Sequence, residues 1–294
     1  MNMRLEQLRS FVAVAELRHF TQAAVAVGVA QPSLSKQIHS LEAELGAPLF
    51  TRLPSEVELT PAGEALLPLA QRILADAETA HREVRNLVGL TSGRVRLGAT
   101  PSLCTSLAPR VLRRFHLAHP DIELRVAEGG SQELVRSLSH GELDLALVVL
   151  PATGIDPALE AAPILEEALV VAAAVGTPLP EPMRVDDLRD RPLVMFRRGY
   201  NLRDDALDAC RRAGFEPTFA VEGGELDAVL EFVEAGLGLA VVPEMVLANR
   251  PGLRAVPLAP PGLRRTIAIA QRRGVSLTHA ASALRDVILA DVCP

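Results

Sequence analysis

The sequence predicts an α/β protein that begins with an all-α winged helix-turn-helix and continues into two Rossmann-like lobes. Three observations predict this fold: a glycine turn between two short helical patterns, a heptad repeat of apolar residues, and apolar runs alternating with helical stretches from residue 93 onwards. The length of 294 residues suits about two domains, because domains average ~150 residues. The expected segments are 1–60 for the winged helix-turn-helix, 61–92 for a linker helix, and 93–294 for the lobes, with 93–164 and 267–294 in the first lobe and 165–266 in the second.

The first 45 residues contain the pattern of three short helices. Apolar residues recur at helical spacing over 5–17, which predicts an amphipathic helix. We expect Thr21 to cap a second helix that runs through Ala26, and Gly28 then supplies the flexible backbone of a tight turn. Pro32 suits the first turn of a third helix that runs to about Leu45. Two helices joined by so short a turn form a helix-turn-helix.

The third helix has one apolar and one polar face. Leu34, Ile38 and Leu41 form its buried stripe, and short or hydrogen-bonding side chains lie off that stripe. Such side chains can contact base edges and phosphates in a major groove, which predicts DNA binding; an ordinary solvated helix face is the alternative. The polar residues are Gln31, Ser33, Ser35, Lys36, Gln37 and His39.

The charge of the chain argues against a nucleic-acid binder. The formal net charge is −6, and residues 1–60 hold five basic against six acidic residues, which leaves −1. The prediction of DNA binding therefore depends on the motif. No apolar run approaches the ~18 residues of a membrane span, and Arg4, Glu6 and Arg9 interrupt the region where a signal peptide is apolar, so we expect a cytoplasmic protein without a membrane partner.

A wing and a long helix follow the third helix. Two short extended pieces flank Leu53-Pro54-Ser55, and Thr60-Pro61 begins a helix. Apolar residues then alternate at spacings of four and three, which favours pairing of this helix between subunits; packing against its own domain is the alternative. The stripe consists of Leu66, Ala70, Ile73, Ala77, Ala80, Val84 and Leu87.

The alternation after residue 93 predicts parallel strands with crossover helices, and the last strand and helix are expected to return to the first lobe. The first strand ends at Ala99 and the second near Glu128, and Ser102 and Ser131 then open helices. Ligands in open α/β sheets lie beyond the carboxyl ends of strands, where helix N-termini favour anions. We therefore expect a small carboxylate ligand; the alternative is that both serines only cap their helices.

The chain resembles the LysR-type transcriptional regulators over essentially its whole length. The resemblance depends on LRSFVAVAE, FTQAAVAVGVAQPSLSKQIHSLEAELGAPLF, Arg52, LTPAGE and EAGLGLAVVP. It implies a regulator of transcription in which a periplasmic-binding-protein-like domain holds a small-molecule effector between its lobes. It also implies a linker-helix dimer, a dimer of dimers (homotetramer), a double-stranded DNA operator as partner, and RNA polymerase as partner of an activator.

The resemblance also assigns residues. Gln31, Pro32, Ser35 and Lys36 match positions that contact DNA, and Arg52 matches a wing position. The acidic wing, with Glu56 and Glu58, departs from the family and predicts weaker DNA binding, because affinity comes from neutralising phosphates. The expected effector residues are Thr100, Ser102, Gly130, Ser131, Val149, Tyr200, Asn201 and Leu202, with Arg197 as a carboxylate clamp or, alternatively, a solvated side chain.

Two alternative functions remain at this point. The segment GYNLRDDALDACRRAG resembles that of the family's peroxide sensor, but only Cys210 matches, and Asn201 stands where the reactive cysteine would be. Cys104, near a helix start, is the other candidate for a redox-active thiol, unless it is a buried structural cysteine. A metabolic enzyme is disfavoured because the sequence lacks a nucleophile elbow and a phosphate-binding glycine loop. No cofactor or metal is expected, and His116 and His119 suit a helix end better than a metal site.

Overall fold

The computed structural model describes residues 3–52, 57–87, 93–151 and 154–292, with the side chains of residues 52, 82, 83 and 85–87 also outside the description. The chain forms two compact units, which are described separately: Met1–Leu90 with Ser139–Glu142, and the remainder. Within the described ranges, none of the helices combines the length and apolar character that crossing a bilayer requires.

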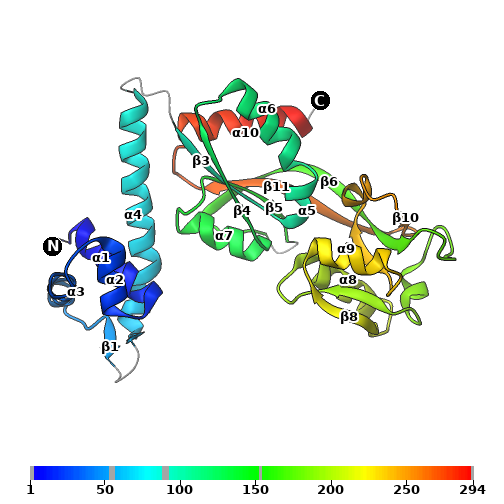
Figure 1. Cartoon of the computed structure of the whole chain (residues 1–294), viewed down its shortest axis with the longest axis horizontal. Coiled ribbons are helices and arrows are strands. Elements are labelled where there is room, and N and C mark those ends of the chain that lie inside the picture. Colours follow the sequence, from blue (N-terminus) through cyan, green and yellow to red (C-terminus); the bar gives the residue numbers. More distant parts are fainter. Residues whose placement is uncertain (1–2, 53–56, 88–92, 152–153, 293–294) are drawn as a thin grey trace. The chain divides into compact units, whose positions relative to one another are not determined.

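The N-terminal unit contains the predicted three helices, α1 (Leu5–Leu17), α2 (Phe20–Val27) and α3 (Gln31–Leu45) (Figure 1). Their apolar faces enclose a core that includes Phe11 and the α3 stripe. Gly28 ends α2 with φ +74°, as the turn requires. The expected cap was wrong: the helix starts one residue earlier than Thr21, and His19 Nδ1 instead accepts from the backbone N–H of Thr21 at 3.2 Å.

The wing consists of β1 (Phe50–Arg52) paired antiparallel with β2 (Val57–Leu59), whereas Leu53-Pro54-Ser55 and Glu56 lie outside the described residues. The ring of Phe50 lies 5.4 Å from that of Phe11 and 5.9 Å from that of Phe20, which anchors β1 to the helices. The Thr60 hydroxyl accepts from the Gly63 N–H at 3.1 Å and confirms the predicted start of the next helix. A Cβ on Gly63 would lie 2.3 Å from the Leu49 carbonyl oxygen, so only glycine fits there.

The long helix α4 (Pro61–Leu87) divides its apolar residues between two uses. Ala70 is fully buried and Leu66 packs against the core of its own unit, so these two residues of the predicted stripe do not face a partner. Ile73 and Val84, in contrast, are exposed, as is Leu69, which lies outside the predicted stripe. The first part of the stripe therefore packs against its own domain, which was the alternative to subunit pairing, because α4 covers α1.

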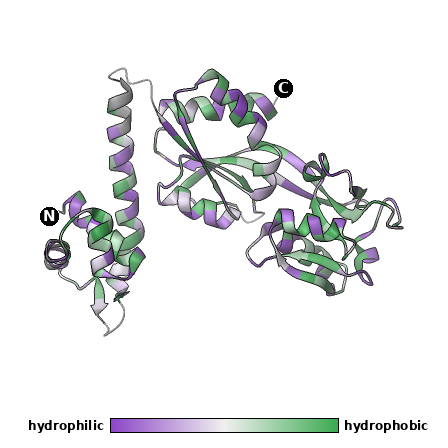
Figure 2. Ribbon diagram, in the orientation of Figure 1, coloured by the Kyte–Doolittle hydropathy of each residue, from purple (hydrophilic) through white to green (hydrophobic). Residues whose placement is uncertain are grey.

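The C-terminal unit contains a seven-stranded mixed sheet in the order β10-β6-β11-β5-β3-β4, with β9 beside β6, and a separate parallel pair β7-β8. Apolar residues are concentrated on these strands (Figure 2). Its strands are β3 (Arg94–Ala99), β4 (Glu123–Glu128), β5 (Leu145–Val149), β6 (Leu159–Ala174), β7 (Leu193–Phe196), β8 (Phe219–Gly224), β9 (Ala240–Pro243), β10 (Leu253–Pro257) and β11 (Leu263–Arg272). Its helices are α5 (Pro101–Thr105), α6 (Ala108–Ala118), α7 (Ser131–Ser139), α8 (Asn201–Arg212), α9 (Leu226–Glu234) and α10 (His279–Val292), with short 3₁₀ turns η1 (Val185–Leu188) and η2 (Glu244–Leu247).

Separate hydrophobic cores define two lobes of this unit. In the first lobe, α6 and α10 cover one face of β3, β4 and β5, and α7 covers the other (Figure 1). The second lobe has its core among α8, α9 and β7, with parts of β6, β9 and β10. The predicted return of the last strand is confirmed, because β11 pairs with β5 and α10 packs in the first core.

Two long strands connect the lobes. The apolar run over 168–175 is not a separate strand of the second lobe, because almost all of it belongs to β6. This 16-residue strand runs from one core into the other beside β11. Both β6 and β9 run antiparallel to their neighbours, so the expectation of parallel strands holds for β3-β4, β3-β5 and β7-β8 but not for the whole unit. A strand that is buried on both faces has a continuous apolar run whether it pairs parallel or antiparallel. The sequence pattern therefore does not distinguish parallel from antiparallel strands.

Candidate effector and DNA-binding sites

A pocket lies where the strands of the first lobe end. It has about 10 Å³ of free space and takes residues from both lobes: Thr100, Pro101, Ser102, Gly130, Val149, Tyr200, Asn201, Leu202 and Arg265. Seven of the nine expected effector residues therefore come together, while Ser131 and Arg197 do not line this pocket. A Cβ on Gly130 would lie 3.0 Å from the Gly199 carbonyl oxygen, so the two lobes are in close contact beside the pocket.

The two serines have different partners. The Ser102 hydroxyl accepts from Arg265 Nη2 at 2.8 Å, and no side-chain bond caps the helix that it opens. Ser131 lines an adjoining pocket, also lined by Val149 and Asn201, and its hydroxyl accepts from the Val149 N–H at 3.1 Å. The helix that Ser102 was expected to open is short: α5 has only five residues and α6 begins separately at Ala108, so the dipole of α5 contributes less than a longer helix would.

The arginine in the pocket wall is Arg265, not Arg197. Arg197 forms an ion pair with Glu225 and its side chain is 40% exposed, which makes it the solvated alternative. Arg265 was missed because an arginine pair, Arg264-Arg265, normally indicates surface. The alternation of side chains along a strand indicates that Arg265 is buried. Arg265 is two residues before the buried Ile267, so both side chains lie on the same face of β11.

Arg265 is buried against an acid. Its guanidinium forms an ion pair with Glu167, the residue directly opposite it on β6, and the two side chains are 3% and 7% exposed. Among the described residues, Nη1 of Arg265 has no acceptor, and the buried Glu167 Oε2 and Tyr200 hydroxyl have no partner. Burial raises the pKa of Glu167, and the charge of Arg265 opposes that rise.

Tyr200 forms the opposite wall of the pocket at the start of α8. Its ring stacks on that of Phe196 with centroids 5.0 Å apart and 4° between the planes. Burial raises the pKa of its hydroxyl, which therefore stays protonated as a hydrogen-bond donor, although it has no partner among the described residues.

The two described cysteines are not activated. Burial and the nearby Glu128 raise the pKa of Cys104 to about 11, and burial with Glu216 raises that of Cys210 to about 11. Cys104 therefore fits the structural alternative rather than the redox-active one, because desolvation outweighs the dipole of a five-residue helix. Cys293 lies outside the described residues.

The histidine pair belongs to a helix end. His119 is the C-cap residue of α6, and its N–H donates to the Phe115 carbonyl at 2.9 Å. No group of three or more potential metal ligands occurs in the described part of the chain.

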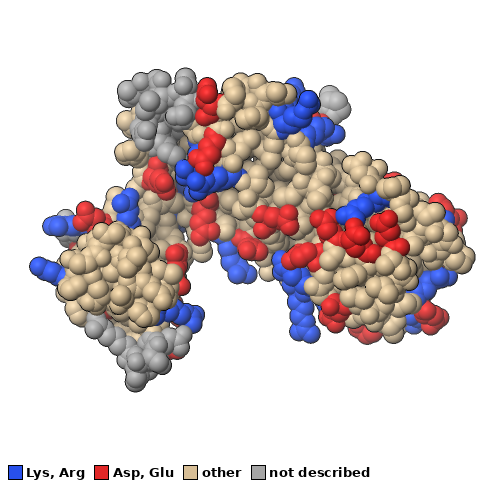
Figure 3. Space-filling model, in the orientation of Figure 1, with Lys and Arg blue, Asp and Glu red and all other residues tan. Residues whose placement is uncertain are grey.

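The polar face of α3 is largely exposed. Pro32, Ser33 and Lys36 are open to solvent, and Gln31 Nε2 donates to Ser35 Oγ at 3.0 Å. Gln37 differs, because it is half-buried and its side-chain oxygen accepts from Ser10 of α1. Arg52 ends β1, but its side chain lies outside the described residues. The displayed face over α1, α2 and α3 is mostly uncharged, so no basic patch stands out there (Figure 3).

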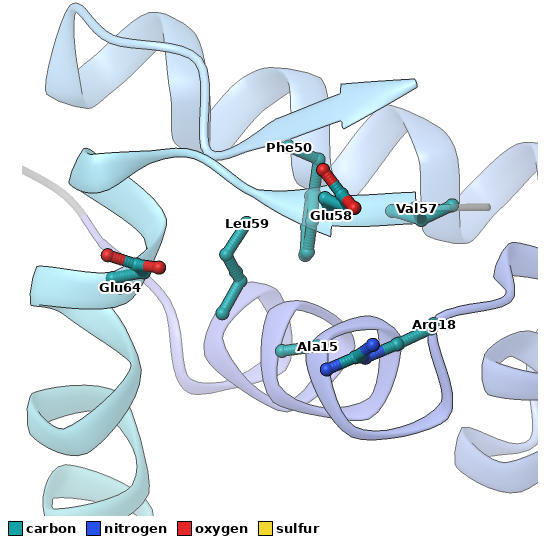
Figure 4. Close-up of a pocket in the computed structure, with 7 residues that line it drawn as sticks. All are labelled: Ala15, Arg18, Phe50, Val57, Glu58, Leu59 and Glu64. Carbon is teal, nitrogen blue, oxygen red and sulfur yellow. The ribbon is translucent and has the colours of Figure 1, made fainter. Parts of the chain in front are cut away.

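A second pocket, of about 250 Å³, lies in the N-terminal unit, between the end of α1, the wing and the start of α4 (Figure 4). Its lining includes Arg18 together with the carboxylates of Glu58 and Glu64. Two acids against one base disfavour phosphate at this place. Glu58, the acidic wing residue that the structure describes, therefore lines a pocket within the N-terminal unit.

Comparisons with known proteins place both units in one family. Residues 5–64 match the bacterial regulatory helix-turn-helix protein family, lysR type, and residues 89–292 match the LysR substrate binding domain. The chain is a LysR-type transcriptional regulator. As such it binds DNA through its helix-turn-helix, and an effector modulates its activity.

Individual relatives agree with this family. The regulator is 36% identical over 271 residues to a probable hydrogen peroxide-inducible genes activator of Mycobacterium avium, covering 90% of this chain and 86% of the relative. It matches a full-length OxyR variant of Pseudomonas aeruginosa with a TM-score of 0.75 and 30% identity, over 98% of both chains. It also matches CbnR in complex with its target DNA, with a TM-score of 0.69 and 26% identity, over 97% and 99% of the two chains.

Proposed function

We propose that this LysR-type regulator senses a small carboxylate, which binds Arg265 in the pocket between the two lobes. The observation that carries the proposal is a buried guanidinium in the pocket wall with one nitrogen, Nη1, that no described residue satisfies. Arginine donors need acceptors, and one oxygen of a carboxylate can accept a charge-assisted hydrogen bond from Nη1. Glu167 and Ser102 hold Nε and Nη2 and so keep the guanidinium in place.

The surroundings make this arginine the main source of anion affinity. Asp and Glu side chains gather over the second lobe on the displayed face, and the chain carries a net charge of −6, so a long-range field does not attract anions (Figure 3). A charge-assisted hydrogen bond is worth about 1.5–3 kcal/mol, roughly tenfold to a hundredfold in affinity. Short-range recognition by Arg265 therefore outweighs the unfavourable surface.

The site favours a compact effector. The pocket has only about 10 Å³ of free space, so its lining side chains must move apart when an effector binds. A longer effector would pass Val149 and Asn201, which line both pockets, and enter the adjoining pocket of about 340 Å³ beside Ser131. The proposed set of effector residues is the predicted one without Arg197 and with Arg265.

For DNA, the proposal uses the exposed face of α3. Gln31, Pro32, Ser33, Ser35 and Lys36 contact the operator, with Arg52 at the wing. Gln37 positions α3 against α1 rather than contacting bases.

The proposed assembly uses the exposed apolar residues of α4. Leu69, Ile73 and Val84 would pair two subunits, and two such dimers would form the tetramer. In this proposal residues 1–60 bind DNA, 61–92 pair subunits and 93–294 bind the effector.

The test is a thermal-shift comparison of small carboxylates with neutral amides of the same shape, such as acetate against acetamide. A ligand of the folded state raises the melting temperature by mass action. We expect the carboxylates to raise it and the amides to leave it unchanged. Equal shifts for both series would contradict anion recognition.

A peroxide sensor is the second candidate, because relatives such as that of Mycobacterium avium carry such names. Against it, Asn201 replaces the reactive cysteine, and the thiols of Cys104 and Cys210 both have a pKa of about 11. Peroxide reacts with thiolates, which are scarce at such values near neutral pH.

A further inference from the structure

The pair Glu167–Arg265 occupies the two strands that join the lobes. The side chains face each other across the β6-β11 ladder, and both are almost completely buried. Their neighbours in sequence, Glu166 and Arg264, pair on the opposite face, where they are 65% and 60% exposed. The strand period therefore places one ion pair in solvent and its equivalent beside the pocket.

Few other charges act on the buried pair. From β11 only Arg265 faces Glu167, and from α8 Asp205 and the hydroxyl of Tyr200 lie within electrostatic reach of Arg265. Glu167 Oε2 and Asp205 Oδ2 are both buried without a hydrogen-bond partner among the described residues. Neither acid therefore has the full set of donors that normally stabilises a buried carboxylate.

A bound effector changes this balance. Without it, Glu167 and Arg265 neutralise each other. A carboxylate on Nη1 places a second anion against one buried guanidinium, and like charges at short range disfavour the ionised form. Glu167 and Asp205 both lack a donor on one oxygen, but Glu167 is the acid that is ion-paired with Arg265, so the second anion acts on Glu167 most directly. Burial has already raised the pKa of Glu167 in the absence of ligand.

We propose that Glu167 takes up one proton when a carboxylate binds Arg265, so that the site recognises an anion together with a proton. This inference rests on the proposed function. The proton comes from solvent and is held on the Glu167 carboxyl, whose ion pair with Arg265 becomes a hydrogen bond from the guanidinium cation to a neutral carboxyl. The ligand carboxylate then becomes the counterion of Arg265. Glu167 is thus a positioning and specificity-determining residue for the effector.

The sign of the pH effect follows from the direction of proton movement. The complex holds one more proton than the free protein, so affinity rises as pH falls between the pKa of Glu167 in the complex and its lower pKa in the free protein. For one proton per ligand, affinity changes by up to about tenfold per pH unit.

Acetate is a suitable probe, since it is a small carboxylate that stays ionised between about pH 5.5 and pH 8. Its dissociation constant is measured by thermal-shift titration on the full chain at several pH values, with sodium chloride at matched ionic strength. We expect tighter binding at lower pH for the wild type and a pH-independent constant for Glu167→Gln. Asp205→Asn is the matched control and should keep the pH dependence.

Each contrary result has a distinct meaning. A pH-independent constant for the wild type, an unchanged slope in Glu167→Gln, or a slope lost only in Asp205→Asn would overturn the inference while leaving the carboxylate site intact. Acetate that does not bind at all, or binds equally after Arg265→Gln, would overturn the proposed function as well. If Glu167→Gln does not fold, the infrared difference spectrum of the wild type with ¹³C-acetate decides, because proton uptake produces a new unlabelled protonated-carboxyl band, and its absence contradicts the inference.

Discussion

Arg265 Nη2 donates a hydrogen bond of 2.8 Å to Ser102 Oγ, which ties strand β11 to the start of α5. Because β11 belongs to both lobes, this bond connects the strand between the lobes to the wall of the pocket. Ser102 therefore acts first on the arginine, and through it on the effector.

Ser102→Ala should lower both stability and effector affinity. It removes one acceptor of a buried guanidinium, which costs about 1–3 kcal/mol of unfolding free energy, and it leaves Arg265 less well oriented for a carboxylate. Urea denaturation and acetate titration measure the two effects. Ser106→Ala, four residues further along and outside the pocket lining, is the control. If Ser102→Ala binds acetate with wild-type affinity, Ser102 does not contribute to effector binding.

Gln31→Ala and Gln37→Ala should behave differently although both glutamines lie on α3. Gln31 is exposed, so its loss should relax discrimination between operator sequences. Gln37 bonds Ser10, so its loss should cost about 1 kcal/mol of stability and weaken binding to all sequences alike. Fluorescence anisotropy with matched and mismatched operators distinguishes them. If Gln31→Ala weakens binding to all operator sequences equally, Gln31 positions α3 on the DNA and does not contact a base.

Ile73→Asp should produce folded monomers, because it places a charge on the exposed part of the α4 stripe. Ala70→Asp, one turn earlier, should instead unfold the N-terminal unit, since Ala70 is fully buried there. Sedimentation velocity and circular dichroism measure assembly and folding. An intact oligomer of Ile73→Asp would show that α4 does not pair subunits through this residue.

The cysteines should be unreactive near neutral pH. With a pKa of about 11, the thiolate fraction at about pH 8 is on the order of one in a thousand, and it rises tenfold per pH unit up to the pKa. Iodoacetamide labelling of Cys104 and Cys210, followed by mass spectrometry as a function of pH, measures this. Rapid labelling at neutral pH, or operator binding that changes with peroxide, would favour the redox alternative.

The sequence correctly predicted helices and strands whose ends are marked by local residues such as glycine and proline. Gly28 and Pro32 mark real boundaries in the helix-turn-helix, and the strand ends at Ala99 and Glu128 lie where expected. The pattern failed where long-range contacts decide. β6 crosses both lobes, because its partner β11 does so, and nothing in the local run shows that length.

In the effector site too, some residues could be predicted from local sequence and others depend on long-range contacts. Residues beside strand ends, such as Thr100 and Gly130, could be placed by topology, because parallel strands end at one edge. Arg265 could not be separated from Arg197 by residue type, because only the fold decides which guanidinium loses its water. Attention to the period-two pattern before Ile267 would have favoured Arg265.

The most direct test of the carboxylate site is calorimetric titration of the strongest carboxylate from the thermal-shift comparison into three proteins: wild type, Arg265→Gln and Arg264→Gln. Arg264 is the neighbouring exposed arginine and controls for lost charge. The double variant Arg265→Gln with Glu167→Gln avoids an unpaired buried acid and keeps the test valid if Arg265→Gln alone does not fold. We predict wild-type affinity for Arg264→Gln and a loss of about tenfold to a hundredfold without Arg265. Wild-type affinity without Arg265, or equal losses for both arginines, would contradict the account.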